Sequence, residues 1–246
     1  MNKLVHAEEF SELLSNYRVS SEGTKLLQNL RLVLLSGPSA SGRNTIIERL
    51  LDKGEYKSIV SDTTRKPRVN NGIKEQNGVT YHFRGEEDFI SDLKQGAFLE
   101  AEIIHNQQVS GISIRELKAV VDSTSIAITE VEIGGFLNIL SRKPDTVGIF
   151  VLPPSFDEWL DRLHSRSRMP AQEVASRLTT GLRIFEEALS NHQARIVIND
   201  NLDKAVDEVD RLAHNRLAPS STEGRKLAAK LRTSTKLYLK DPEAFA

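Results

Sequence analysis

Apolar runs of strand length alternate with segments of helical spacing along most of the chain. The run "RLVLLSG" at 31–37 is stopped by glycine and proline, as a buried parallel strand would be, and the next run, 43–54, has helical spacing. This alternation is typical of an α/β fold, a mostly parallel sheet with helices on both faces. The other segments predicted as strands are 57–61, 79–83, 97–104, 125–132, 146–152 and 194–199, and those predicted as helices are 86–95, 113–122, 155–166, 172–189 and 201–215.

The two ends of the chain differ from this pattern. Residues 1–30 space their Leu, Phe and Val as amphipathic helices do, with a break at "SSEG" and a second helix predicted to begin at Ser20 or Ser21. Residues 216–246 hold more Lys and Arg than Asp and Glu, which indicates a linker followed by a basic helix. We therefore expect one α/β domain at 31–215 between an N-terminal helical extension and a basic C-terminal tail.

Composition narrows the possible functions. The 246 residues carry 33 basic and 34 acidic side chains, so the whole protein has no electrostatic reason to coat nucleic acid or an anionic membrane. The absence of cysteine excludes disulfides, thiolate nucleophiles and Cys-ligated metals, and it fits a reducing cytoplasm. No apolar run approaches the roughly 20 residues of a membrane span. We expect a cytoplasmic protein, and its oligomeric state cannot be read from the sequence.

The stretch "SGPSASGRNT" is similar to the phosphate-binding loop of nucleotide-binding proteins. Gly37 and Gly42, with four residues between them, lie between a strand and a helix and allow backbone N–H groups to curl around phosphate oxygens. The usual Lys is replaced by Arg43, which keeps a positive charge on a planar fork. A tight turn without chemical use is the alternative. The residues expected to bind ATP in this loop are Gly37, Ser39, Ala40, Ser41, Gly42, Arg43, Asn44 and Thr45.

The usual Ser or Thr ligand of Mg²⁺ is replaced in this loop by Asn44. The Asn44 amide oxygen could bind the metal or a metal-bound water, although Mg²⁺ is demanding about geometry. Thr45, one residue later, could supply a hydroxyl after a small shift.

A second phosphate grip is predicted in "SDTTRKPR". Arg65 and Arg68 flank Pro67 three residues apart, and two guanidinium forks in one rigid turn make a good clamp for a phosphate dianion. A solvated basic turn is the alternative reading.

With these motifs in view, the chain resembles guanylate kinase from about Arg31 to Asn215. In that family "S..TTR.PR", an acid and "Y.F" line the GMP lobe, which corresponds to about 61–112 here. The resemblance implies that Arg65, Arg68 and Tyr81 hold the GMP phosphate and that Ser61 contacts the base. Glu75 matches the acid, with a few extra residues before it.

The resemblance continues in "GAFLEAEI", where Glu100 matches a glutamate that recognises guanine. A carboxylate can accept two parallel N–H bonds from guanine N1 and N2, and adenine offers no such pair. An acid at a surface strand edge is the alternative. Ser110, or Val109, stands where the family has a tyrosine on the GMP phosphate, so one phosphate contact is missing or shortened.

"AITEVEIGG" resembles the family's Asp-x-Asp-x-x-Gly segment, with Glu130 and Glu132 in place of both aspartates. Two residues apart on a strand, both carboxylates would share one face, as a metal and substrate site needs. We expect Glu130 to serve the metal and Glu132 to serve GMP. Two acids on a solvated edge strand are the alternative.

The segment at about 160–178 resembles the family's mobile lid. Arg162 and Arg166 lie one helical turn apart, and Arg177 follows across a short loop, so the resemblance implies that all three neutralise the transferring phosphoryl group. "IVINDNLDKA" resembles the turn beside the adenine, which places Asn199 at ATP and also as a candidate cap of the helix that begins near Leu202.

Together these motifs predict Mg²⁺-dependent transfer of the γ-phosphoryl group of ATP to GMP. Three alternatives stay open: a kinase of another nucleotide or phosphorylated small molecule, a non-catalytic guanylate-kinase-like binding module, and nucleic-acid binding through the basic tail. Neither a basic patch on the domain nor an aromatic ladder supports the third. The binding module is disfavoured because the loop glycines and the lid arginines are kept.

Overall fold

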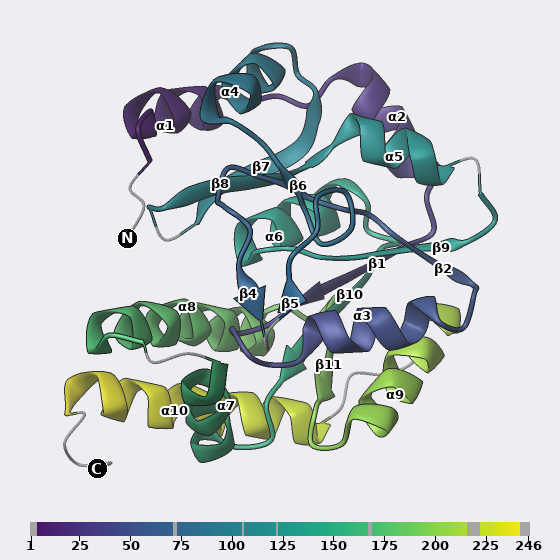
Figure 1. Ribbon diagram of the computed structural model, residues 1–246. Coiled ribbons are helices and arrows are strands. Elements are labelled where there is room, and N and C mark those ends of the chain that lie inside the picture. Colours follow the sequence, from purple (N-terminus) through teal and green to yellow (C-terminus); the bar gives the residue numbers. More distant parts are fainter. Residues whose placement is uncertain are drawn as a thin grey trace. The chain divides into compact units, whose positions relative to one another are not determined.

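The computed structural model describes residues 4–70, 73–104, 106–121, 123–166, 169–215 and 222–241. The chain forms two compact units. The first unit combines residues 1–32 with 56–143, and the second combines 33–55 with 144–246 (Figure 1). The residues expected to bind the phosphates of ATP lie in the second unit, and those expected to bind GMP lie in the first.

The second unit is built on parallel strands. β10 lies between β1 and β11 and pairs in parallel with both. Every residue of β1 and β10 is buried, as their continuous apolar runs predict. The strands are β1 (Leu32–Ser36), β10 (Val147–Leu152) and β11 (Arg195–Ile198), and the helices are α3 (Arg43–Leu51), α7 (Phe156–Arg166), α8 (Ala171–Ser190), α9 (Leu202–His214) and α10 (Thr222–Lys240).

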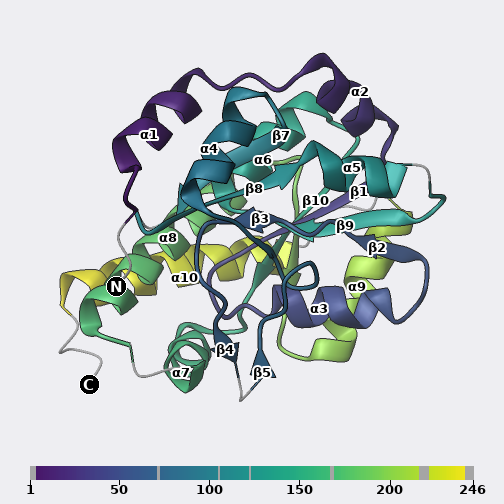
Figure 2. The ribbon, with the colours of Figure 1, turned by 45° about the horizontal axis from the view of Figure 1, so that its top comes forward.

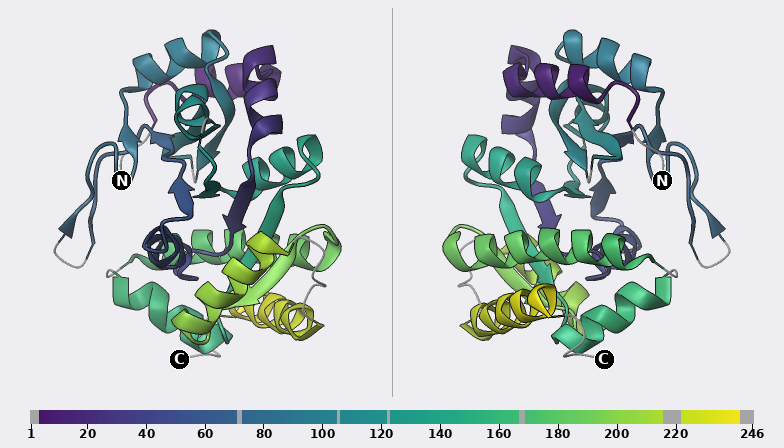
Figure 3. Two further views of the ribbon diagram at one scale, coloured as in Figure 1. Left: turned by 90° about the vertical axis from the view of Figure 1, so that its right-hand side faces the viewer. Right: turned by 90° about the vertical axis from the view of Figure 1, so that its left-hand side faces the viewer.

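The basic C-terminal segment packs on this unit as a helix. α10 lies along α8 (Figures 1 and 3) and buries Gly224, Ala228, Leu231 and Thr235, which recur at helical spacing. Arg225 of α10 donates hydrogen bonds to the carbonyls of Ala188 and Leu189 at the end of α8, at 3.1 and 3.0 Å. The helix predicted in the tail is therefore present, and one of its cations caps a neighbouring helix.

The first unit contains a parallel pair and a separate mixed sheet. β2 pairs in parallel with β9, whereas the sheet of order β6-β3-β8-β7 is antiparallel at β3/β8 and β7/β8. The strands are β2 (Tyr56–Ser58), β3 (Asp62–Thr63), β6 (His82–Phe83), β7 (Phe98–Ile104), β8 (Gln108–Ser113) and β9 (Ile126–Glu130). A small hairpin of β4 (Val69–Asn70) and β5 (Ile73–Lys74) projects from this unit (Figure 3).

Five helices complete the first unit. The second of them begins where the sequence predicts, because the Ser20 hydroxyl caps it by accepting a hydrogen bond from the Gly23 amide at 3.2 Å. α2 packs against α5 (Figure 2). The helices are α1 (Ala7–Asn16), α2 (Ser21–Asn29), α4 (Glu86–Lys94), α5 (Ile114–Val121) and α6 (Ile133–Arg142).

The α/β fold class is confirmed by the parallel strand pairs and their intervening helices. The strand predicted at 79–83 is shortened to His82–Phe83, and β8 was not among the predicted strands. The antiparallel sheet is the main departure from the predicted parallel arrangement. Within the described ranges, no helix combines the length and apolarity that a bilayer span requires.

Candidate active site

The loop from Gly37 to Thr45 has the conformation expected of a phosphate cradle. β1 ends at Ser36, Gly42 forms the N-cap of α3 with φ 94°, and Ala40 also has a positive φ of 66°. A Cβ added to Gly37 would lie 2.3 Å from the Val151 carbonyl oxygen, so only glycine fits there. The first N–H groups of an α-helix have no partner within the helix, so the start of α3 suits the binding of an anion.

Side chains from elsewhere in the second unit fix this loop. Asn199 is buried, and its Nδ2 donates to the Ser41 carbonyl at 2.8 Å and leaves no room for a side chain at Gly42. Trp159, fully buried, donates from Nε1 to the Ser39 carbonyl at 2.8 Å. The prediction that Asn199 caps α9 is wrong. The cap is Asn201, whose side-chain oxygen accepts a hydrogen bond from the Lys204 amide at 3.1 Å.

The polar side chains of the loop face different surroundings. Ser41 is buried, and its hydroxyl has no hydrogen-bond partner among the described residues, so it is available to a ligand bound in the loop. Arg43 is half-buried on the first turn of α3, where Asn44 and Thr45 are exposed. The loop therefore fits phosphate groups through its backbone and the Arg43 cation.

The lid arginines are held by neighbouring groups on their helices. Arg162 of α7 donates to the Asn199 carbonyl at 3.1 Å and to Glu158 at 3.0 Å. Arg177 of α8 donates to Glu173 at 2.7 Å. Arg166 is the last residue of α7, and its side chain lies outside the described part of the structure. Each of Arg162 and Arg177 is thus paired with a carboxylate four residues earlier on its own helix.

In the first unit, Arg65 is the centre of the expected phosphate clamp. Its guanidinium lies 4.6 Å from the centroid of the Tyr81 ring and 5.5 Å from that of Phe83, and both of its terminal nitrogens bind Glu75. Burial alone would lower the pKa of Arg65, but the carboxylate of Glu75 and the Tyr81 hydroxyl raise it. Arg65 is therefore a fixed cation, and a bound phosphate would compete with Glu75 for it.

The clamp extends through its neighbours. Glu75 also accepts from the Arg68 amide at 2.7 Å, and these partners outweigh burial and lower the pKa of Glu75. Tyr81 donates from its hydroxyl to Glu130 at 3.1 Å. The structure therefore brings the expected residues Arg65, Glu75, Tyr81 and Glu130 into one connected cluster.

Ser110 lies on β8, and Ser61 directly precedes the neighbouring strand β3. The Ser61 carbonyl accepts from the His82 amide at 2.9 Å, and its side chain is half-buried. The Ser110 hydroxyl donates to the Thr63 hydroxyl at 2.7 Å. Ser110 is thus engaged within the sheet and is too short to replace a tyrosine without a change of partner.

Glu100 projects from β7 against the first turn of α6. A Cβ added to Gly135 would lie 2.5 Å from a carboxyl oxygen of Glu100, and one added to Gly134 would lie 2.6 Å from Glu102. Glu102 also accepts from the Gly135 amide at 3.3 Å. The two glutamates therefore sit side by side at the positive end of a helix, in space that glycines leave open.

The surroundings of Glu100 favour its protonated form. Burial is the largest cause, and the charges of Glu102 and Glu132 add to it, so that the pKa of Glu100 rises to about 8 although the Ile112 amide opposes the shift. Glu100 is half-buried against α6, although β7 is an edge strand of its sheet.

The expected pairing of Glu130 with Glu132 on one strand face is wrong. β9 ends at Glu130, and Glu132 is the N-cap residue of α6, so the chain turns between them and the alternation of a strand no longer applies. The described residues hold no group of three or more Asp, Glu or His side chains that could bind a metal by themselves. A Mg²⁺ site at Asn44 or Glu130 would need ligands from substrate phosphates.

Two contributors were missed by sequence reasoning. Glu102 stands two residues after Glu100 on β7, and the period of a strand could have placed it on the same face. Trp159 belongs to the core, and its hydrogen bond to Ser39, 120 residues away, leaves no local pattern in the sequence.

Stability of the Glu100→Gln variant tests the protonation of this site. The Glu100 pKa of about 8 in the folded protein exceeds its ordinary value of 4.5, so the stability that its proton contributes is present at low pH and is lost as the pH rises toward 8. Glutamine cannot ionise. The melting temperature of Glu100→Gln should therefore match that of the wild type near about pH 5 and exceed it near about pH 9.

The exposed Glu87 of α4 offers the matched control for this experiment. Glu87→Gln should follow the wild type at every pH in thermal melts. Parallel melting curves for Glu100→Gln and the wild type across this range would contradict the assigned environment.

Comparison with known proteins agrees with this geometry. A family model described as "Guanylate kinase" matches residues 29–216. The guanylate kinase of Corynebacterium diphtheriae is 34% identical over 190 residues, which cover 76% of this chain and 95% of that protein, and that of Desulfitobacterium hafniense is 35% identical over 180 residues, which cover 72% and 86%. The crystal structure of guanylate kinase from Anaplasma phagocytophilum shares the fold, with a TM-score of 0.59 at 21% identity over 79% of this chain and 88% of that one. The chain belongs to the guanylate kinase family.

Proposed function

We propose that this chain transfers the γ-phosphoryl group of ATP to the phosphate of GMP and releases ADP and GDP. The observation that carries the proposal is the loop between β1 and α3, which keeps the glycines, the left-handed turn at Gly42 and a cation at Arg43. A family member that only recognised a partner would have no need of this strained donor loop.

On the donor side, the backbone of Gly37 to Thr45 holds the phosphates of ATP and Arg43 supplies the neutralising charge. Arg162, Arg166 and Arg177 close over the transferring group and exclude water, because an open site would hydrolyse ATP. Asn199 supports the site by fixing Ser41, which makes it a positioning residue for the loop as well as a candidate neighbour of the adenine.

On the acceptor side, Arg65 and Arg68 with Tyr81 hold the phosphate of GMP. Glu75 keeps Arg65 in place before the nucleotide arrives, and Ser110 offers a weaker contact than a tyrosine would. Glu100 accepts hydrogen bonds from the N1–H and N2–H groups of guanine, with Ser61 at the base and Glu132 at the start of α6 beside it. This set of acceptors favours guanine, since adenine has no adjacent pair of donors.

Catalysis then rests on position and charge. An oxygen of the GMP phosphate attacks the γ-phosphorus of ATP, the new P–O bond forms as the bond to the ADP oxygen breaks, and no covalent protein intermediate is needed. Mg²⁺, when bound, would neutralise charge on the phosphate oxygens, and Asn44 and Glu130 are the residues that we expect to hold it. Asn44 is the weakest part of this arrangement because an amide oxygen replaces a hydroxyl ligand.

GMP and ATP are thus the expected partners. A cytoplasmic location, and a division into residues 1–30, 31–215 and 216–246 with a GMP lobe and a lid, remain predictions from the sequence.

The direct test is an ADP-release assay with ATP, Mg²⁺ and each of GMP, AMP, UMP and CMP. Turnover with GMP far above the others is the expected result. Binding of GMP without phosphate transfer to any acceptor would instead identify a binding module, and equal turnover of another nucleotide would reassign the acceptor.

Removal of the Arg43 charge should slow the chemical step. Arg43→Ala is expected to lower kcat about a hundredfold, the usual loss for one electrostatic group at a transferring centre, with a much smaller change in KM for GMP. Steady-state kinetics measure both constants. Arg49→Ala is the matched control, because Arg49 lies on the same helix and pairs with the surface Asp203 at 2.8 Å. Equal kcat values in both variants would remove Arg43 from the mechanism.

Recognition of guanine should depend on pH. Only the ionised form of Glu100 accepts two N–H bonds, and its pKa of about 8 means that raising the pH increases the fraction ready to bind. KM for GMP should therefore fall as the pH rises toward 8, while KM for ATP follows no such trend. Glu102→Gln, which removes a neighbouring charge, should move the fall to lower pH. A KM for GMP that is flat in pH would contradict the role given to Glu100.

A further inference from the structure

The N-terminal extension lies almost entirely outside the family match and yet forms part of the core of the first unit. Leu4 and Phe10 are 5% and 0% exposed, and they pack in one cluster with Phe89 and Phe98. The Phe89 and Phe98 rings stack at 4.3 Å, and Phe10 meets Phe89 edge-on at 6.1 Å. The extension is therefore joined by aromatic packing to β7, the strand that carries Glu100.

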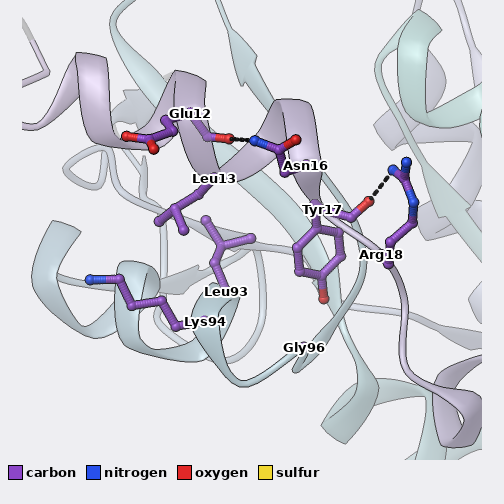
Figure 4. Close-up of a pocket in the computed structure, with 8 residues that line it drawn as sticks. All are labelled: Glu12, Leu13, Asn16, Tyr17, Arg18, Leu93, Lys94 and Gly96. Carbon is purple, nitrogen blue, oxygen red and sulfur yellow. Dashed lines mark hydrogen bonds between the residues drawn. The ribbon is translucent and has the colours of Figure 1, made fainter.

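Tyr17 makes the closest link. It follows α1, and its ring points toward the segment of Gly96, away from Arg18, in the pocket between α1 and α4 (Figure 4). Its hydroxyl accepts from the Phe98 amide at 2.8 Å and donates to the Phe98 carbonyl at 2.6 Å. β7 is an edge strand of its sheet, so one phenol satisfies both outward groups of this residue, as a neighbouring strand would.

The contact falls at an irregular point of the strand. The pairing of β7 with β8 shifts between Phe98 and Glu100, which leaves Leu99 as an extra residue. A bulge of this kind turns the following side chain, so the aim of Glu100 depends on how the bulge is held.

Helix α2 of the extension holds Leu99, the residue after Phe98, through contacts with Arg142. Arg142 donates to the Leu99 carbonyl at 3.2 Å, and the Arg142 carbonyl accepts from Gln28 of α2 at 2.9 Å. The buried Lys143 binds the Gln28 carbonyl at 3.0 Å. The two bulge residues before Glu100 are thus both fixed, directly or through one intermediate, by the N-terminal extension.

We propose that Tyr17 is a positioning residue for guanine recognition: by holding both backbone groups of Phe98, it fixes the bulge that directs Glu100 at the base. The inference rests on the proposed function, because Glu100 must read guanine for its position to matter. A carboxylate accepts hydrogen bonds from both N1–H and N2–H only when it lies in the plane of the base. Small displacements of the carboxylate therefore weaken the binding of guanine.

The test compares GMP with inosine monophosphate, whose base lacks the 2-amino group and so loses one of the two bonds. Tyr17→Phe removes both hydrogen bonds to Phe98 and keeps the ring. We expect the GMP-to-IMP ratio of kcat/KM to fall about tenfold, through KM for GMP, with kcat nearly unchanged. A purely structural role would lower stability and leave this ratio alone.

Leu13→Ala is the matched control, because Leu13 packs on the same core and has no bond to β7. It should lower the melting temperature and keep the wild-type ratio.

Amide hydrogen exchange of the wild type gives a measurement that needs no variant. The Phe98 amide should exchange slowly although it lies on a sheet edge.

The outcomes separate the two hypotheses. If the wild type prefers GMP to IMP and Tyr17→Phe keeps that ratio, the role of Tyr17 is overturned and the proposed function stands. Rapid exchange of the Phe98 amide would likewise overturn it. If the wild type phosphorylates no GMP, both fail.

Discussion

The candidate site of the first unit depends on the placement of two carboxyls at the start of α6. Glu100 and Glu102 fill space that only Gly134 and Gly135 leave open, within 2.6 Å of where side chains would begin. The helix end attracts their negative charge, but burial and mutual repulsion oppose it and raise the pKa of Glu100 to about 8. Guanine has two adjacent N–H donors, and so it supplies the hydrogen bonds that this pair of carboxyls lacks.

The departures from the family pattern leave the framework of the site in place. Arg43 keeps a cation at the donor loop, and Glu130 keeps a carboxylate in contact with Tyr81. The loop backbone is held by Asn199 and Trp159, neither of which depends on the replaced residues. The substitutions therefore change the length and direction of side chains within an intact backbone framework. This is more typical of a kinase with an altered site than of one that has lost its activity.

The sequence was sufficient where chemistry and local pattern coincide. The loop could be predicted because a buried strand, two spaced glycines and a helix follow one another, and Glu100 because a motif surrounds it. The antiparallel sheet could not be predicted, because β3 and β6 are only two residues long and leave no hydrophobic alternation in the sequence. Glu132 was misplaced because nothing local marks the end of β9, and Tyr17 was missed because its partner lies 81 residues away.

The most direct test of this account is the protonation of Glu100 with and without nucleotide. The side-chain carboxyl carbon can be followed by ¹³C NMR at neutral pH and assigned by its loss in Glu100→Gln. The account predicts the chemical shift of a neutral acid in the free protein and that of a carboxylate once GMP is bound. A resonance that GMP leaves unchanged would contradict the recognition of guanine by Glu100.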